Sequence, residues 1–426
     1  MNVEANIKTA ETAQTTPERI LIYGINYTPE PIGVGRYSGE LGSYLGRQGV
    51  IVDVVTAVPH YPGWSVSGAY RNRYCTETLD GVRIWRCPLF LKKQMRGIWR
   101  VLAPLSFAIT SAPVAFWLIL KKRPRTVLCI EPTLLSAPAA ILAAKLIGAR
   151  TVLHVQDLEM DAAFAIGHLN NGLIKRLALF LEARLMRVFD VVITISFAMR
   201  KQLEAKGIPS NRLEIIRNWV DLEKIRPLAV ANSYLGELGL EEKDFVVQYA
   251  GNIGAKQALH VVLEAAARLV SRPNIQFVIA GEGPEKASLQ SRFGHLPNVR
   301  FLGLQPEESL CEFLNLASLH IIPQDAGAAD LVLPSKLGGM LASGKPVLAM
   351  ADAETELGQF LKGAAIIVPT GNVDAVVNAI DAQSMNPVQF RDASNNLVAQ
   401  LDSKVNLPTF SVALFSRNER PNGPKD

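Results

Sequence analysis

The fold of this chain is decided by the stretch Leu333-Pro334-Ser335-Lys336-Leu337-Gly338-Gly339-Met340-Leu341-Ala342-Ser343-Gly344-Lys345-Pro346. It predicts a short helix that begins near Pro334 and Ser335, with a capping hydroxyl, and ends at Gly344 before a buried strand. Backbone N–H groups at a helix start attract an anion, and Ser335 and Lys336 add a hydroxyl donor and a positive charge there. The stretch therefore predicts a phosphate-binding turn, with an ordinary capped helix of an α/β core as the alternative.

Length and composition predict two domains and a mildly basic protein. The chain has 426 residues, 49% of them hydrophobic, so we expect two domains of about 200 residues each. A formal net charge of +5 fits anionic small molecules or an anionic membrane surface and is too weak to indicate nucleic acid. The four cysteines lie far apart without metal-ligand spacing, so neither a zinc site nor a disulfide framework is expected. This pattern favours reduced thiols in a cytoplasmic protein.

Short apolar runs alternate with helical patterns almost throughout, which indicates parallel βαβ units. The predicted strands are 19–25, 51–57, 82–87, 126–130, 150–155 and 190–195, followed by 245–250, 275–280, 299–302, 319–322, 346–350 and 365–368. In such sheets ligands bind beyond the carboxyl ends of the strands. We therefore predict an α/β fold of two Rossmann-like doubly wound domains that face each other across a cleft. The predicted segments are a disordered extension 1–18, an N-terminal domain 19–217, a linker 218–244, a C-terminal domain 245–387, a helix region 388–415 and a tail 416–426.

One apolar segment interrupts this α/β pattern. Residues Val101 to Leu120 carry no charge, and basic residues flank them, namely Lys92, Lys93, Arg96 and Arg100 before and Lys121, Lys122 and Arg123 after. Pro104 and Pro113 break the run, and a strand pattern follows at once, which argues against a spanning helix. Two interpretations remain, a helix that lies on an anionic bilayer surface and a core helix that packs on the sheet.

Two glycine loops each follow a predicted strand and open a helix. Gly33 and Gly35 come about eight residues after Ile25, too late for a dinucleotide fold, so this spacing counts against a nicotinamide dehydrogenase. Close approach to a phosphate or sugar and a simple need for flexible φ values remain alternatives there. The second loop runs from Gly251 to Lys256, where the helix start is already positive, so Lys256 favours a bound anion such as a diphosphate.

Polar side chains close the predicted strand 150–155. His154 and Asp157 lie at its carboxyl end, where the cleft is expected. His154 is therefore a candidate to bind sugar hydroxyls or to act as a base, and a hydrogen-bonded structural histidine is the alternative. The other five histidines lack this context.

Together these motifs resemble the family 4 retaining glycosyltransferases of the GT-B fold, over about Ile20 to Leu401. The matching segments are Gly33–Gly35, Ile195–Met199, Asn218–Asp221, Gly251–Gln257, Ala280–Pro284 and Ser343–Val347. Within the family, the chain is most similar to exopolysaccharide enzymes of the colanic acid fucosyltransferase type, through Tyr23–Tyr27, Trp85–Leu89 and Thr355–Gln359. The resemblance implies a sugar nucleotide held mainly by the second domain and an acceptor held mainly by the first.

The residues and the resemblance define a candidate site. We predict three catalytic residues, His154, Lys256 and Lys336, five donor-binding residues, Gly251, Asn252, Gly281, Ser335 and Glu356, and three acceptor-side or phosphate-loop residues, Gly33, Gly35 and Asp157. No Asp-x-Asp motif is present in the sequence, so we expect a metal-independent reaction without a cofactor. As the substrate, we expect a GDP-sugar in preference to a UDP-sugar. Three positions depart from the family pattern, because Asn252 replaces an arginine and Leu331 and Gly339 replace two glutamates.

The expected function is transfer of a hexose-type sugar, with retention, from a nucleoside diphosphate sugar to a lipid-linked oligosaccharide in bacterial exopolysaccharide biosynthesis. The enzyme would lie at the inner face of the plasma membrane, without a nucleic-acid partner. One alternative is a nucleotide-sugar epimerase, which would need a pair of carboxylates in the cleft. The other is a non-catalytic sugar-nucleotide-binding subunit, which Asn252 and Gly339 suggest.

Overall fold

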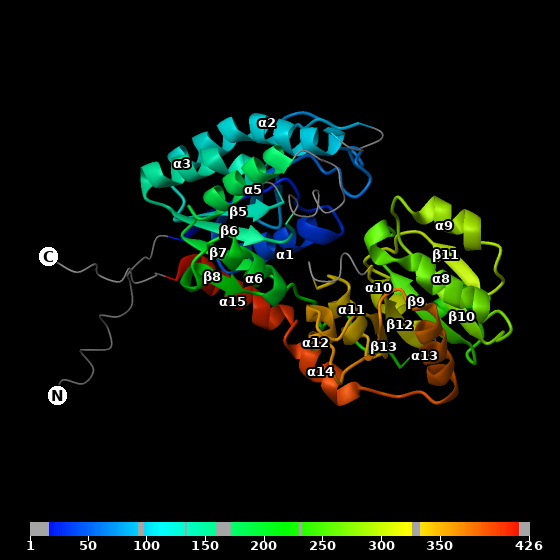
Figure 1. Cartoon of the computed structure of the whole chain (residues 1–426). Coiled ribbons are helices and arrows are strands. Elements are labelled where there is room, and N and C mark those ends of the chain that lie inside the picture. Colours follow the sequence, from blue (N-terminus) through cyan, green and yellow to red (C-terminus); the bar gives the residue numbers. More distant parts are fainter. Residues whose placement is uncertain are drawn as a thin grey trace, which may run out of the picture.

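The described part of the chain forms two α/β domains. The computed structural model describes residues 17–92, 98–132, 134–158, 172–229, 232–325 and 333–416. Figure 1 shows two separate sheets, the first built from the N-terminal half of the chain and the second from the C-terminal half. The strand order and direction confirm the prediction of two Rossmann-like doubly wound domains.

The first sheet has the strand order β3-β4-β2-β1-β5-β6-β7-β8, and its edge strand β3 pairs antiparallel with β4. Its strands are β1 (Arg19–Tyr23), β2 (Ile51–Ala57), β3 (Cys75–Leu79), β4 (Val82–Cys87), β5 (Thr126–Glu131), β6 (Arg150–Val155), β7 (Val191–Thr194) and β8 (Leu213–Ile215). The second sheet is parallel and has the order β11-β10-β9-β12-β13-β14. Its strands are β9 (Phe245–Ala250), β10 (Ile275–Ala280), β11 (Val299–Leu302), β12 (Leu319–Ile322), β13 (Val347–Met350) and β14 (Ile366–Val368). The strand order reverses beside β1 in the first sheet and beside β9 in the second. In doubly wound sheets the ligand crevice lies at such a reversal.

Helices cover both faces of the first sheet, because its strands alternate apolar side chains to both sides. Leu21 and Tyr23 pack in the cluster that contains α2 and α3, whereas Ile20 and Ile22 pack in the cluster that contains α1 and α15. The helices of this half are α1 (Gly33–Arg47), α2 (Ile98–Lys122), η1 (Leu134–Ser136), α3 (Ala137–Ile147), α5 (Gly172–Met186), α6 (Phe197–Ala205) and η2 (Ser210–Arg212). In Figure 1, α2, α3 and α5 lie together on one side of the first sheet.

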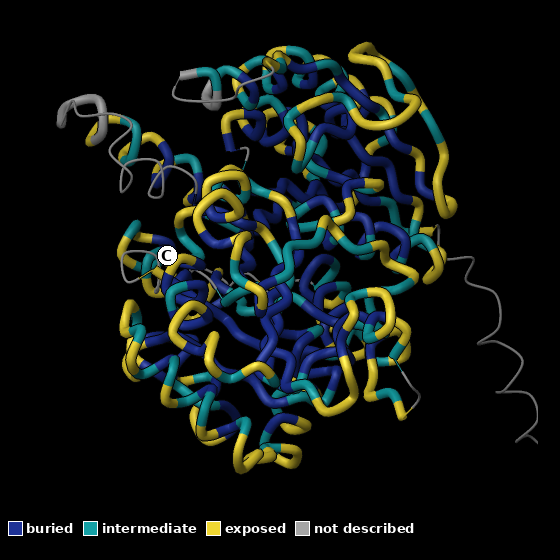
Figure 2. Tube along the Cα trace, turned by 90° about the vertical axis from the view of Figure 1, so that its right-hand side faces the viewer, coloured by how far each residue is buried: buried dark blue, intermediate teal, exposed yellow. Residues whose placement is uncertain are grey.

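The second half of the chain builds its own core and then returns to the first. Its helices are α7 (Ser233–Glu237), η3 (Ala255–Gln257), α8 (Leu259–Arg268), α9 (Lys286–Phe293), α10 (Leu310–Asn315), α11 (Leu337–Ala342), α12 (Glu356–Phe360), α13 (Val373–Met385), α14 (Arg391–Ala399) and α15 (Ser403–Phe415). The predicted helix region 388–415 divides between the domains: α14 packs on α11, whereas α15 packs on the first sheet, where Thr126 Oγ1 donates to the carbonyl of Leu414 at 3.0 Å. Figure 2 shows the strands buried and the outer helix turns exposed.

Helix α2 contains the apolar segment singled out in the sequence. The part from Leu102 to Lys122 is long and apolar enough to cross a membrane by length and composition alone. However, the structure packs one side of it on the sheet, with the fully buried side chains Ala103, Phe107, Ala115, Leu118 and Ile119. One face of α2 is therefore core, as one of the two interpretations required.

Three local predictions were wrong. Strands β3 and β8 were not predicted, because β3 is a largely exposed edge strand with polar residues and β8 has only three residues. The helix after Pro334 begins at Leu337, and its N-cap is Lys336 without a side-chain hydrogen bond, so Ser335 does not cap it. At Gly338 a Cβ would lie 3.2 Å from the Cβ of Val220, which explains a glycine inside this helix.

Candidate active site

Lys336 lies where the second sheet meets the cleft. Its Nζ lies 3.9 Å from the centre of the Tyr249 ring, at the end of β9. Burial lowers the pKa of Lys336 to about 7, from an ordinary value of 10.5. Among the described residues no carboxylate pairs with it. A desolvated cation without a counter-ion is suited to a bound anion.

Glycines at the ends of β9 and β10 make room for this lysine. A Cβ at Gly251 would lie 3.3 Å from Cδ of Lys336, and a Cβ at Gly281 would lie 1.8 Å from the carbonyl oxygen of Gly251. Both glycines have φ values in the left-handed half of the map, +150° and +141°. The structure thus brings together three predicted site residues, Gly251, Gly281 and Lys336.

Lys256 and Asp157 belong to different domains and lie close enough for their charges to interact. Lys256 lies in η3, and Asp157 follows β6 of the first domain. Burial raises the pKa of Asp157, and the positive charge of Lys256 opposes this rise, so the two side chains are within electrostatic range. Asn252 is exposed in the same loop, and its Nδ2 donates to Oε1 of Gln257 at 3.4 Å. The loop therefore carries one cation, Lys256, and one exposed amide, Asn252, which is hydrogen-bonded within the loop.

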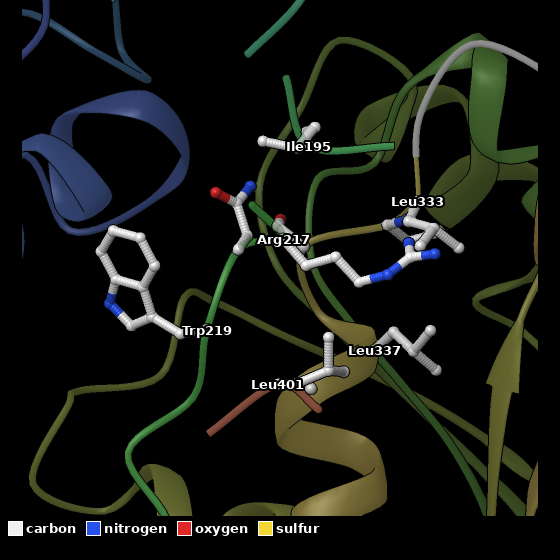
Figure 3. A pocket seen from close by; sticks show the side chains of 10 residues that line it. Ile195, Arg217, Trp219, Leu333, Leu337 and Leu401 are labelled. Carbon is white, nitrogen blue, oxygen red and sulfur yellow. The ribbon is translucent and has the colours of Figure 1, made fainter. Parts of the chain in front are cut away.

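A pocket between the domains is lined by residues from both. Its walls are Ile195, Arg217, Asn218, Trp219, Leu333, Pro334, Ser335, Leu337, Gly338 and Leu401. Figure 3 shows Arg217 extending toward Leu333, whereas the Trp219 ring points in the opposite direction. The indole Nε1 of Trp219 donates to Oε2 of Glu40 on α1 at 2.7 Å, which holds this wall of the pocket to the first domain.

An amide pair borders this pocket. Asn218 Nδ2 donates to Oε1 of Gln156 at 3.0 Å. The remaining amide atoms, Nε2 of Gln156 and Oδ1 of Asn218, are buried and have no partner. One free donor and one free acceptor complement neighbouring sugar hydroxyls, and leaving both unpaired would cost free energy.

His154 lies inside the first domain. Its side chain is buried on β6, its ring packs edge-on against Phe410 of α15 with centroids 4.8 Å apart, and its Nε2 has no partner. Burial lowers its pKa to about 3, so the imidazole is neutral at physiological pH. His154 does not line the pocket. Its catalytic role stays a prediction.

Glu356 connects the two domains. Its carboxylate accepts from the backbone N–H groups of Phe197 and Ala198, at 3.0 and 2.6 Å, and pairs with Arg217 at 3.0 Å. The carboxylate therefore occupies the N-terminus of α6, where a negative charge is favourable. Its predicted donor-binding role stays a prediction.

The glycine loop before α1 is shaped by packing. Gly33 has a φ of +64°, and a Cβ at Gly35 would lie 2.7 Å from Oε2 of Glu30. Glu30 is buried and accepts hydrogen bonds from the backbone N–H groups of His60 and Tyr61, each at 3.0 Å. Farther along α1, the hydroxyl of Tyr37 donates to the carbonyl of Ser335 at 3.3 Å, so this loop and the exposed Ser335 lie near one another.

Both halves of the chain match known domain families. Residues 33–219 match the glycosyl transferase 4-like domain, and residues 232–397 match the glycosyl transferases group 1 domain. Over 375 residues the chain is 39% identical to WcaI of Escherichia coli K12, whose name describes a colanic acid biosynthesis glycosyl transferase, and the match covers 85% of this chain and 91% of WcaI. This chain is a family 4 glycosyltransferase.

Solved structures show that this family 4 glycosyltransferase has the GT-B fold. Sucrose-phosphate synthase of Thermosynechococcus elongatus matches with a TM-score of 0.69 at 15% identity, over 92% of this chain and 97% of that one. Anabaena HepE, in complex with UDP and glucose, matches with a TM-score of 0.66 at 15% identity, over 94% and 100%. WaaG, a glycosyltransferase of lipopolysaccharide biosynthesis, matches with a TM-score of 0.65 at 12% identity, over 93% and 100%.

Sequence reasoning missed several residues at the domain boundary of this glycosyltransferase. Arg217 lines the pocket and pairs with Glu356, and its only sequence signal is a basic residue at the end of the first domain. Gln156 could have been noticed as the amide between His154 and Asp157. Of the two positions where the family has glutamates, 331 lies outside the described residues, and a Cβ at Gly339 would lie 3.2 Å from Leu314, so α11 packs closely there.

Proposed function

We propose that this glycosyltransferase moves a hexose-type sugar, with retention, from a nucleoside diphosphate sugar to a lipid-linked oligosaccharide in exopolysaccharide assembly. The observation that carries the proposal is Lys336, which lies over Tyr249 beside the glycine turn at Gly251 and pairs with no carboxylate among the described residues. A diphosphate is the anion that a sugar-transfer reaction brings to such a cation. Lys256 supplies a second positive charge on the same loop system.

Charge stabilisation by these lysines permits a mechanism without an enzymic nucleophile. The bond between the anomeric carbon and the diphosphate oxygen breaks, and the acceptor oxygen bonds to the same face of the sugar. The departing phosphate oxygen takes the proton from the acceptor hydroxyl. Lys256 and Lys336 stabilise the negative charge that develops on the diphosphate, more in the transition state than in the bound donor.

The acceptor side of the proposal rests on the relative and on the pocket. WcaI is named for colanic acid biosynthesis, and this chain matches 91% of it. The unpaired amide atoms of Gln156 and Asn218 would hydrogen-bond sugar hydroxyls at the boundary between the domains. We propose a GDP-sugar as the preferred donor and a reaction without a metal ion.

Turnover of purified protein with GDP- and UDP-sugars and a lipid-linked or water-soluble oligosaccharide acceptor tests this function. We expect a glycoside whose anomeric configuration matches the donor, formed equally well in the presence of EDTA. Conversion of the donor sugar without an acceptor would identify an epimerase instead. A donor-induced rise in melting temperature without turnover of any donor and acceptor pair would identify a binding subunit.

A further inference from the structure

A pocket in the C-terminal domain lies outside the candidate active site. It is bounded by residues 227–228 of the linker, residues 343–346 before β13 and residues 387–391 at the start of α14. Its volume of about 340 Å³ is within the range of pockets that bind small organic molecules. We call this cavity the linker pocket.

The linker pocket lies at the amino ends of the strands of the second sheet. Phe245 is the first residue of β9 and Ser318 directly precedes β12, and both line the pocket. Near the carboxyl end of β9, the Tyr249 ring contacts Lys336 of the candidate active site. The strands of a parallel sheet run in one direction, so the two sites lie at opposite edges of this sheet. A ligand in the linker pocket would therefore bind apart from the sugar nucleotide.

The linker pocket carries two positive charges. Lys345 and Arg391 line it, whereas no aspartate or glutamate is among its lining residues. Among the residues that the structure describes, neither side chain has a hydrogen-bond or ion-pair partner. Burial lowers the pKa of Lys345, and the positive charge of Arg391 lowers it further, so the two side chains are within electrostatic range. An anion bound between them would remove this repulsion.

The start of α14 also favours an anion at this place. Its N-cap residue, Phe390, has no side-chain hydrogen bond to the helix, and Arg391 is its first residue. The backbone N–H groups of a first turn attract negative charge. Asp392 lies in the same turn, but its side chain is exposed and does not line the pocket.

Hydrogen bonds fix two walls of the linker pocket. Asn315, which lines it, accepts from the N–H of Leu228 at 2.9 Å through Oδ1 and donates to the carbonyl of Arg226 at 2.9 Å through Nδ2. The buried Gln383 exchanges two hydrogen bonds with the backbone of Val388, at 2.9 and 3.0 Å. The pocket is thus preformed, which lowers the entropy cost of binding a ligand.

We propose that the linker pocket binds a small phosphomonoester through Lys345 and Arg391. A phosphate dianion matches two neighbouring cations, and a planar guanidinium can bind two of its oxygens. Ser318 Oγ accepts from the N–H of Val246 at 3.1 Å, so its own hydrogen is left to donate to a phosphate oxygen. The apolar side chains at 227–228 would pack against the carbon skeleton of the ester, which inorganic phosphate lacks.

Isothermal titration calorimetry of the full-length protein with glycerol 3-phosphate, inorganic phosphate and glycerol tests the proposal. We expect glycerol 3-phosphate to bind, inorganic phosphate to bind more weakly and glycerol not to bind. Glycerol 3-phosphate should also raise the melting temperature, because it binds only the folded chain. Lys336→Ala should keep this binding, since Lys336 belongs to the other site.

Variants of the two cations identify the site. Lys345→Gln and Arg391→Glu should each weaken binding of glycerol 3-phosphate by about tenfold or more, because a charge-assisted hydrogen bond is lost. Arg391→Glu should fold, because a negative charge is favourable in the first turn of α14 and would attract Lys345. The matched control, Lys362→Glu, reverses an exposed charge of the same domain outside the pocket and should bind like the native protein.

Four outcomes would overturn the proposal. They are no binding of glycerol 3-phosphate by the native protein, native-like affinity in Arg391→Glu, an equal loss in Lys362→Glu, and loss of binding in Lys336→Ala, which would place the ligand at the active site. Equal affinity for inorganic phosphate would overturn the assignment to an ester. Sugar transfer by the native protein tests the proposed function separately, because no step of that reaction uses Lys345 or Arg391.

Discussion

The ammonium nitrogen of Lys336 lies 3.9 Å from the centre of the Tyr249 ring. The ring face stabilises the cation, while burial lowers the pKa of Lys336 to about 7. The protein thus places a positive charge at the end of β9 in a buried environment that disfavours the charged form of lysine. A bound diphosphate would remove this cost, because it supplies the opposite charge that the described protein groups do not.

Removal of either lysine tests this relationship. We expect Lys336→Ala or Lys256→Ala to lower kcat by roughly 100-fold, as for the loss of one group that stabilises developing negative charge. The control is Lys362→Ala, which removes an exposed lysine of the same domain. Steady-state kinetics with the preferred donor measure the effect, and near-normal turnover of both site variants would refute the phosphate site.

Donor affinity should depend on pH through Lys336. Only its charged form attracts a diphosphate, so affinity for free nucleoside diphosphate should fall as pH rises through about 7, by up to roughly tenfold per pH unit until the raised pKa of the complex is reached. Lys336→Arg keeps its charge and should flatten the profile. Isothermal titration calorimetry from about pH 6 to pH 9 measures both proteins. Parallel profiles would show that another group titrates.

Lys336 also makes the stability of the fold depend on pH, and stability should rise with pH whereas donor affinity should fall. Its pKa is about 7 in the folded chain and 10.5 ordinarily, so between these values the unfolded chain binds the extra proton. Its contribution to the free energy of unfolding therefore rises with pH across this window. Denaturant unfolding of the native protein and of Lys336→Met, whose unfolding free energy should lack this rise, provides the measurement. Equal pH slopes for the two proteins would contradict the lowered pKa.

His154 should make the first domain sensitive to acid. Its pKa is about 3 in the folded chain and 6.5 ordinarily, so the unfolded chain gains a proton first, and about 2 kcal/mol of stability should be lost by about pH 5. His154→Phe should remove this loss, because a phenyl ring preserves the contact with Phe410. His320, whose pKa burial also lowers to about 3, keeps its own contribution in both proteins.

The same variant tests the catalytic role predicted for His154. Transfer, donor affinity and melting temperature are measured for His154→Phe and the native protein at neutral pH. Loss of transfer with unchanged donor affinity and melting temperature would support the catalytic role. Retained transfer would show that the histidine is structural.

Glu356 should stabilise the junction of the domains. Glu356→Ala leaves Arg217 and two backbone N–H groups without their acceptor, so we expect a loss of about 3 kcal/mol in the free energy of unfolding. The exposed neighbour provides the control Glu354→Ala, which should be near neutral. A raised KM for the donor with unchanged stability would instead favour the donor-binding role predicted from the sequence.

The fold could be predicted closely because parallel strands are buried on both faces. Seven strands, among them β2, β6 and β9, have the predicted bounds, since a continuous apolar run bounded by turn residues defines a buried strand. Strand β3 escaped prediction because its Cys75–Leu79 sequence is largely polar and exposed. The cluster of Gly251, Gly281 and Lys336 was also predictable, because strand ends in one parallel sheet meet at one edge.

The sequence by itself determined two doubly wound domains and a cationic, glycine-rich edge on the second, because local hydrophobic periodicity and turn residues specify these features. Only the tertiary structure decided which side chains meet across the domains. The contacts of Glu356 with α6 and of Tyr37 with Ser335 cross between the domains and join residues 158 and 298 positions apart. Within the first domain, the contact of His154 with Phe410 forms because α15 returns from the second domain. Such contacts depend on how separately folded surfaces pack, and no local pattern in the chain encodes that packing.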